Sequence, residues 1–209
     1  GQWRGGHRSL PPGLNTQRMK KSILILMAVT VIACNQQHAV VVPPVVAPKP
    51  DRSALLSQQN VDATIYQNSS AECVRLFEQC YELAKTRLDQ NLARPHTLPA
   101  AVIVDIDETV LDNSAYQVTN AAKGRNYTKE SWNQWALMGA AKALPGAVDF
   151  LKYAVSRDCA VYYITNRATS EKNATIKNLF ELGFPMADEA HVMTMEGDVS
   201  DKTDRRALV

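Results

Sequence analysis

The sequence lacks the features that mark several large classes of protein. Its 209 residues include only four cysteines and four histidines, which form no zinc-type cluster, and no internal repeat is visible. A basic surface is also missing from most of the chain, because outside residues 1–33 there are 18 basic and 21 acidic residues, a net charge of −3. Nucleic-acid binding requires a basic face, so nucleic acid is not an expected partner.

The first 33 residues have a different character. Met19-Lys20-Lys21 precedes the apolar run 23–33, which is too short to span a bilayer comfortably and has the order of a secretory signal. The run ends in Val31-Ile32-Ala33-Cys34, which is similar to the bacterial lipobox, where the cysteine carries the lipid. An ordinary cleavage site or a signal anchor is the alternative. Asn35, rather than Asp, follows the cysteine, and by the bacterial sorting rule this favours the outer membrane.

These patterns predict a plan for the whole chain. Residues 1–18 are expected to be an upstream extension that is not native, and 19–33 a lipoprotein signal peptide. Residues 34–52 form a proline-rich tether. The globular domain is expected over 53–209, with a cap-like insert at about 114–144, and the 45% of hydrophobic residues in the chain are ample for its core.

One stretch stands at the centre of that domain. Residues 100–104 are apolar and predict a buried strand, and the acids Asp105 and Asp107 follow it at once. Such a position is the crevice where open α/β sheets bind ligands. Two close carboxylates repel each other, so they need a cation, a shared proton, or separate roles as nucleophile and general acid. The alternative is that they only cap the following turn.

The remaining pattern predicts an α/β fold with a doubly wound parallel sheet and N-terminal helices. The expected helices are 53–91 with a break at 68–70, then 145–157, 169–182 and one from Lys202; the later strands are 160–164, ending in polar residues 165–167, and 191–193.

Within the insert, Thr128 is a plausible helix N-cap, and Trp132 and Trp135 then share a helix face. These rings and Tyr116 either pack against the body of the domain or contact a ligand, and the residues alone leave both readings open.

The cysteines inside the domain do not define a disulfide. Cys73 and Cys80 lie on one predicted helix with Cα atoms about 10.5 Å apart, which is too far for a bond between them. Cys159 either pairs with one of them or is a buried thiol.

The acidic stretch also carries a family resemblance. Asp105-Ile106-Asp107-Glu108-Thr109 resembles motif I of the haloacid dehalogenase (HAD) superfamily, and residues 107–116 resemble the bacterial class C acid phosphatases, which are lipoprotein 5'-nucleotidases. The likeness spans roughly residues 54–209. It also includes Trp132-x-x-Trp135, Leu144-Pro145-Gly146-Ala147, Tyr163-Ile164-Thr165-Asn166-Arg167 and Lys202-x-x-Arg205.

The resemblance implies a HAD-like Rossmannoid fold and a role for each matched residue. Asp105 would be the nucleophile and Asp107 the general acid and base. Thr165 would bind a phosphoryl oxygen, and Lys202 would neutralise its charge. Contacts with substrate are expected from a further group of side chains: Asn166, Arg167, Tyr116, Trp132 and Trp135.

The resemblance also implies a Mg²⁺ cofactor. The Asp105 carboxylate and the Asp107 backbone carbonyl would bind it, and a third ligand is expected beyond Val209, on a strand that the sequence as given does not contain. The implied activity is a lipid-anchored acid phosphatase of the cell envelope that cleaves nucleoside monophosphates or other small phosphomonoesters. The alternative is a non-catalytic surface lipoprotein on the same scaffold, inactive because this ligand is lost.

Overall fold

The computed structural model describes Arg52, Leu55 and residues 60–209. The predictions of an upstream extension, a signal peptide, lipidation at Cys34 and nearly all of the tether lie outside the described residues. No helix in the described part combines the length and the apolar character that crossing a membrane requires.

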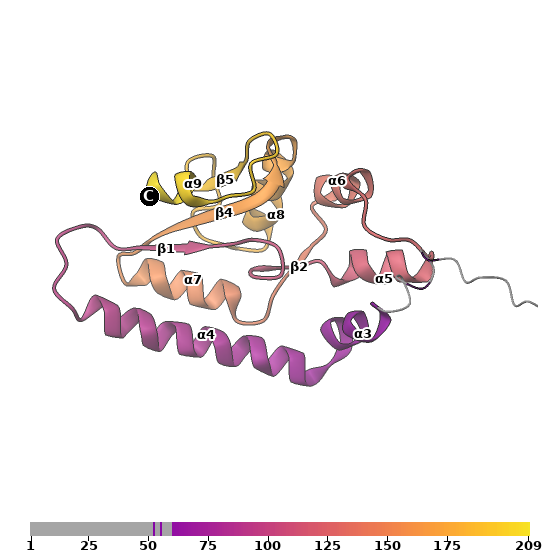
Figure 1. Ribbon diagram of the computed structural model, residues 1–209. Coiled ribbons are helices and arrows are strands. Elements are labelled where there is room, and N and C mark those ends of the chain that lie inside the picture. Colours follow the sequence, from indigo (N-terminus) through magenta and orange to yellow (C-terminus); the bar gives the residue numbers. More distant parts are fainter. Residues whose placement is uncertain (1–51, 53–54, 56–59) are drawn as a thin grey trace, which may run out of the picture. The chain divides into compact units, whose positions relative to one another are not determined.

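A parallel three-stranded sheet forms the centre of the domain (Figure 1). Its strands are β1 (Ala101–Val104), β4 (Ala160–Ala168) and β5 (Val192–Met195), in the order β1-β4-β5. Ala101 pairs with Ala160, and Tyr163 pairs with Val192. Parallel neighbours need crossover connections, and helices supply them, so the predicted α/β class and parallel sheet are confirmed.

Helices cover the sheet as their apolar spacing predicts. Helix α7 (Ala147–Ser156) leads into β4, and a short 3₁₀ turn (Thr169–Glu171) and helix α8 (Lys172–Glu181) connect β4 to β5. The inward side chains of α7 and β4, which include Leu151 and Val161, are fully buried in one core. That core holds the sheet rigid beneath the loops at its carboxyl edge.

Before the sheet, residues 61–92 form two helices, with the break that the sequence predicts. Helix α3 (Val61–Ser69) ends where Ser70 caps α4 (Ala71–Leu92) by accepting a hydrogen bond from the Cys73 N–H at 3.4 Å. Helix α4 packs along α7 in Figure 1. The ring centres of Tyr81 on α4 and Phe150 on α7 are 5.6 Å apart.

The insert is a small helical layer on a two-stranded base. Strands β2 (Leu111–Asp112) and β3 (Lys142–Ala143) pair antiparallel and flank α5 (Ser114–Ala122) and α6 (Lys129–Met138). Thr128 caps α6, as predicted, because its hydroxyl accepts the Ser131 N–H at 3.1 Å. The final helix is α9 (Thr203–Ala207), which begins just after Lys202.

Two expectations about the strands were wrong. Residues 100–104 were expected to be buried, but Ile103 is 40% exposed and only alternate residues of β1, Val102 and Val104, pack on the core. Strand β4 was expected to end near residue 164, but it continues through Ala168. Its polar side chains can lie inside a strand because neighbouring side chains satisfy their hydrogen bonds.

The three described cysteines are free. Cys73 and Cys159 are buried and Cys80 is exposed. Cys159 is therefore a buried thiol in this structure rather than a disulfide partner, and its burial raises the pKa of that thiol.

Candidate active site

A tight loop holds the two acids at the end of β1. Ile106 is fully buried, and its carbonyl accepts the N–H groups of Val110 and Leu111, both at 2.9 Å. From α4, the Tyr81 hydroxyl donates to the Thr109 carbonyl. Burial raises the pKa of Tyr81 to about 12, so its hydroxyl stays protonated and keeps donating. The positions of the acids are therefore set by core packing on both sides of the loop.

Asp105 lies at the open side of this loop, and its side chain is 44% exposed. Its Oδ1 accepts the Ile106 N–H at 2.7 Å and the Lys202 ammonium at 2.8 Å. Lys202 comes from the segment that begins α9, so the structure brings together the two residues predicted to be nucleophile and charge neutraliser. Among the described hydrogen bonds, none reaches Asp105 Oδ2.

Asp107 is held far more closely, and its side chain is 21% exposed. Oδ1 accepts the Arg167 Nη2 at 2.7 Å and Nε at 3.1 Å, and it also accepts the Asn113 Nδ2 at 2.9 Å. Among the described residues, the one donor to Oδ2 is the same Arg167 Nε, at 3.2 Å. The two acids, which are neighbours in sequence, therefore have separate cationic partners.

The Arg167 side chain is 1% exposed. Its Nη1 donates to the Thr175 hydroxyl at 3.1 Å, and the guanidinium lies 5.7 Å from the centre of the Trp132 ring. Through these contacts the guanidinium binds Asp107 and other residues of the protein interior rather than facing solvent. Contact between Arg167 and substrate stays a prediction, and the geometry favours a role in supporting Asp107.

Thr165 is also buried, with 1% exposure, and its hydroxyl accepts the Arg167 backbone N–H at 3.1 Å. Arg205 of α9 donates to the Thr165 carbonyl and to the Asn166 side chain, the latter at 2.7 Å. This guanidinium ties α9, and with it Lys202, to the end of β4. Asn166 itself is exposed, and it lies on β4, the strand that pairs with β1.

The aromatic residues of the insert pack on one another. Tyr116 is 4% exposed, its hydroxyl pairs with Ser131 Oγ at 2.8 Å, and its ring meets Trp132 edge-on at 5.4 Å. The Trp135 indole N–H donates to Asn113 Oδ1 at 2.8 Å. Packing thus accounts for Tyr116 and Trp135, whereas Trp132 and Tyr127 also line a small cavity beside Asn166.

Comparison with known proteins identifies the family. The model of HAD superfamily subfamily IIIB (acid phosphatase) matches residues 20–209. The chain belongs to this acid phosphatase family. Two solved structures of the class C acid phosphatase from Bacillus anthracis are similar, one of them a crystal structure with tungstate bound. Identity is 37% in both, with TM-scores of 0.71 and 0.70.

Those matches cover 73% of this chain and 64% of each B. anthracis chain. The chain therefore spans about two thirds of the length of its solved relatives. The resemblance to class C acid phosphatases and the HAD-like fold predicted from the sequence are both confirmed.

The sequence patterns give no role to three residues of the candidate active site. Asn113 is fully buried beside Asp107, Thr175 supports Arg167, and Arg205 fastens α9. Asn113 and Arg205 fell within the motifs that carry the resemblance, but the Thr175 position on a helix face gave no signal.

The described donors suit a magnesium ion of the kind that the family implies. Within the described ranges, no three His, Cys, Asp or Glu side chains gather into a metal site. Magnesium does not need such a cluster, because it keeps several waters and is often bound by one or two carboxylates together with substrate phosphate. The half-exposed Asp105 carboxylate fits that donor set, and no described backbone hydrogen bond uses the Asp107 carbonyl.

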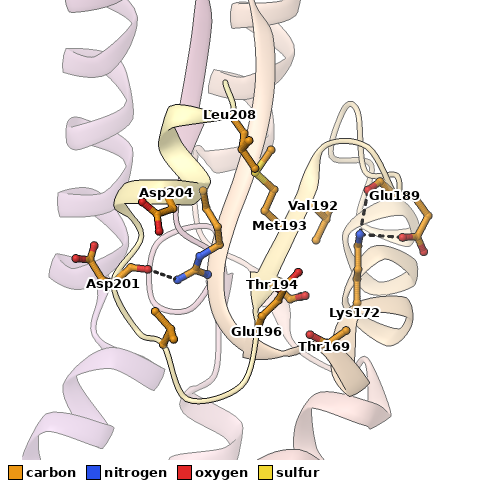
Figure 2. A pocket seen from close by; sticks show the side chains of 12 residues that line it. Thr169, Lys172, Glu189, Val192, Met193, Thr194, Glu196, Asp201, Asp204 and Leu208 are labelled. Atoms are coloured by element: carbon orange, nitrogen blue, oxygen red, sulfur yellow. Dashed lines mark hydrogen bonds and ion pairs between the residues drawn. The ribbon is translucent and has the colours of Figure 1, made fainter.

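A cavity of about 410 Å³ lies elsewhere, between α8, β5 and α9 (Figure 2). Lys172 on its wall is paired with Glu189 at 2.9 Å, and Arg205 is held by the Asp201 carbonyl. Several acidic side chains line it, but Asp105 and Asp107 do not. It is therefore a poor phosphate site and separate from the candidate active site.

Proposed function

We propose that this protein is a Mg²⁺-dependent phosphomonoesterase that acts through an aspartyl-phosphate intermediate, with nucleoside monophosphates as its substrate class. The observation that carries the proposal is the 2.8 Å pair between Asp105 and Lys202, beside a second carboxylate with its own support. A nucleophile near a cation and a separately held acid are the parts that phosphoryl transfer needs.

In the first step, Asp105 Oδ2 attacks phosphorus and the bond from phosphorus to the ester oxygen breaks. Asp107 gives its proton to that oxygen, so the alcohol leaves neutral and Asp107 becomes a carboxylate. Lys202, already beside Asp105, balances the charge on the phosphoryl group. Thr165, at the end of the neighbouring strand, is proposed to bind a phosphoryl oxygen.

In the second step, the Asp107 carboxylate removes a proton from water as the water oxygen bonds to phosphorus. The bond from phosphorus to Asp105 breaks, which frees inorganic phosphate and restores both acids. Magnesium, held by the Asp105 carboxylate and the Asp107 carbonyl, would supply positive charge that stabilises the phosphoryl oxygens in both steps.

The proposed nucleoside group rests on the small cavity beside Asn166. About 250 Å³ in volume, it is lined by Tyr127 and Trp132, whose ring centres are 6.3 Å apart. Aromatic faces stack on nucleobases, which supports a nucleotide over a purely aliphatic ester. The cavity opens next to the strand that carries Thr165.

Phosphate release from AMP by the full-length gene product, with and without Mg²⁺, tests this function. Asp105→Asn keeps the side-chain volume and removes the nucleophile, so we expect kcat/KM to fall by about 10⁴-fold or more. Asp112→Asn is the matched control, because Asp112 bonds Gln67 and the Ser114 N–H rather than the site. Turnover that survives Asp105→Asn, or that ignores Mg²⁺, contradicts the mechanism. A folded parent that binds tungstate without turnover supports the non-catalytic alternative.

We further propose that the protein is anchored in the bacterial cell envelope, at the outer membrane, by lipid on Cys34. The lipobox-like sequence before Cys34 supports this placement. Cys34→Ser should move the protein from the membrane fraction to the soluble fraction, whereas Cys80→Ser should not. Retention of the Cys34→Ser protein in membranes contradicts a lipid anchor.

A further inference from the structure

The two oxygens of the Asp107 carboxylate have unequal surroundings. Oδ1 accepts three N–H groups, two from Arg167 and one from Asn113. From the part of the chain that the structure describes, Oδ2 accepts one N–H, the Arg167 Nε that it shares with Oδ1, at 3.2 Å. Because a carboxylate oxygen has about two lone-pair sites, Oδ1 is saturated. Oδ2 is the oxygen that has room for a proton.

The Asn113 amide is fixed in the orientation that this arrangement requires. The side chain is fully buried, and its Oδ1 accepts the Trp135 indole N–H at 2.8 Å. An indole nitrogen can only donate a hydrogen bond, so it must face the amide oxygen. The amide nitrogen is thereby turned toward Asp107. Asn is suited to this place because it accepts on one side and donates on the other.

Trp135 belongs to α6, so the hydrogen bonds run from the insert to the acid. The Tyr116 ring, 6.2 Å away, packs against Trp135, and the Trp132 ring one turn earlier on the helix lies over Arg167. Arg167 and Asn113, the two residues that donate to Oδ1, are thus each contacted by a tryptophan of the same helix, α6. A shift of α6 would disturb Asp107 from both sides.

We propose that Asn113 and Trp135 are positioning residues that keep Asp107 Oδ1 saturated, so that Oδ2 alone carries the proton to the leaving oxygen. This inference rests on the proposed function. In the step it concerns, the Oδ2–H bond breaks and its proton joins the ester oxygen. The charge left on the carboxylate is then shared with Arg167 and Asn113. The insert helix would therefore set the direction of proton transfer as well as cover the site.

Trp135→Phe tests the inference, because it keeps an aromatic side chain on α6 and removes the N–H donor to Asn113; the volume that it also removes should affect both substrates alike. We expect kcat/KM for AMP, whose alkoxide leaving group needs a proton, to fall by about 10-fold, part of the 10²–10⁴-fold that a general acid supplies. For p-nitrophenyl phosphate, whose leaving group departs as a stable anion, the loss should stay below about 2-fold. Asn113→Leu should show the same split with a larger loss on AMP.

The matched control is Gln134→Ala, because Gln134 is an exposed neighbour on the same helix. This variant should leave kcat/KM unchanged for both AMP and p-nitrophenyl phosphate. Equal losses on both substrates in an active enzyme would mean that Trp135 supports folding or binding only, and would overturn the positioning role. Absence of turnover in every protein, the parent included, would instead overturn the proposed function.

A second measurement does not depend on turnover. The chain has three tryptophans, so the ¹⁵N indole signal of Trp135 can be assigned by its loss in Trp135→Phe. We expect Asp107→Asn to move this signal and Asn113→Leu to speed its hydrogen exchange, whereas Asp105→Asn leaves it unchanged. If the Trp135 signal neither moves in Asp107→Asn nor exchanges faster in Asn113→Leu, the proposed chain of hydrogen bonds is overturned.

Discussion

Asp105 and Asp107 lie two residues apart in one loop, yet their surroundings are opposite in kind. Asp105 is 44% exposed and is held through one oxygen, by a backbone N–H and a lysine that is itself 22% exposed. Asp107 is 21% exposed and is gripped by a guanidinium that is 1% exposed. The first acid is left approachable on its second oxygen, and the second is fixed in direction.

This difference matches the chemistry proposed for each acid. A nucleophile must move toward phosphorus, and a single flexible ammonium permits that movement while it balances charge. A general acid must point its proton at one atom, and a planar guanidinium with a buried amide restricts it to one orientation. The kind of cation beside each acid therefore indicates the role of that acid more clearly than the acid itself does.

The largest expected effect of breaking one side of this comparison is on turnover at Asp105. Lys202→Met keeps the length of the side chain and removes its charge, so we expect kcat/KM for AMP to fall by about 10²–10³-fold. The free energy of unfolding should change by less than about 1 kcal/mol, because the pair is partly exposed. Lys172→Met, which breaks the pair with Glu189, is the control. A large loss of stability in Lys202→Met would contradict a purely electrostatic role.

At Asp107 the expected effect is on stability. Asp107→Ala leaves the buried Arg167 guanidinium without its counter-charge, and the free energy of unfolding in urea should fall by about 3 kcal/mol, the lower end for a broken buried pair. Asp105→Ala should lower it by less than about 1 kcal/mol.

The double change Asp107→Ala with Arg167→Met sharpens this result. It removes the unpaired charge together with its partner, so much of the lost stability should return. Equal unfolding free energies for Asp105→Ala and Asp107→Ala would remove the distinction between the two acids.

The sequence predicted one half of this comparison better than the other. The strand before Asp105 was predicted from its apolar residues, and a site position for Lys202 was predicted through the family resemblance. The Arg167 contact with Asp107, across 60 residues of sequence, was not predicted, because Thr165-Asn166-Arg167 has the polarity typical of the end of a strand. Polar residues indicate the end of a strand only where their side chains are exposed to water. The Arg167 side chain is buried, and its hydrogen-bond partners lie in the protein interior.

Strand periodicity carried part of the missing information. In β4, Tyr163, Thr165 and Arg167 are all buried and lie two residues apart, so they share one face of the strand, whereas Asn166 on the other face is exposed and Ile164 on that face is buried. That alternation would place Arg167 inside once the strand is known to continue. It would not name Asp107 as the partner, because the contact depends on how the loop after β1 folds back over the sheet.

The smallest expected effect concerns the outer support of Arg167. Thr175 is fully buried, and its hydroxyl accepts from Arg167 Nη1 and donates to the Glu171 carbonyl at 2.9 Å. Thr175→Val keeps the shape and leaves one buried guanidinium N–H without its acceptor, so we expect unfolding to become easier by about 1–2 kcal/mol. Thr203→Val, an exposed threonine at the start of α9 on the Asp105 side, should cost less than about 0.5 kcal/mol. If the two variants unfold alike, the rigidity that separates Asp107 from Asp105 does not extend beyond Arg167, and the carboxylate is held by its direct partners alone.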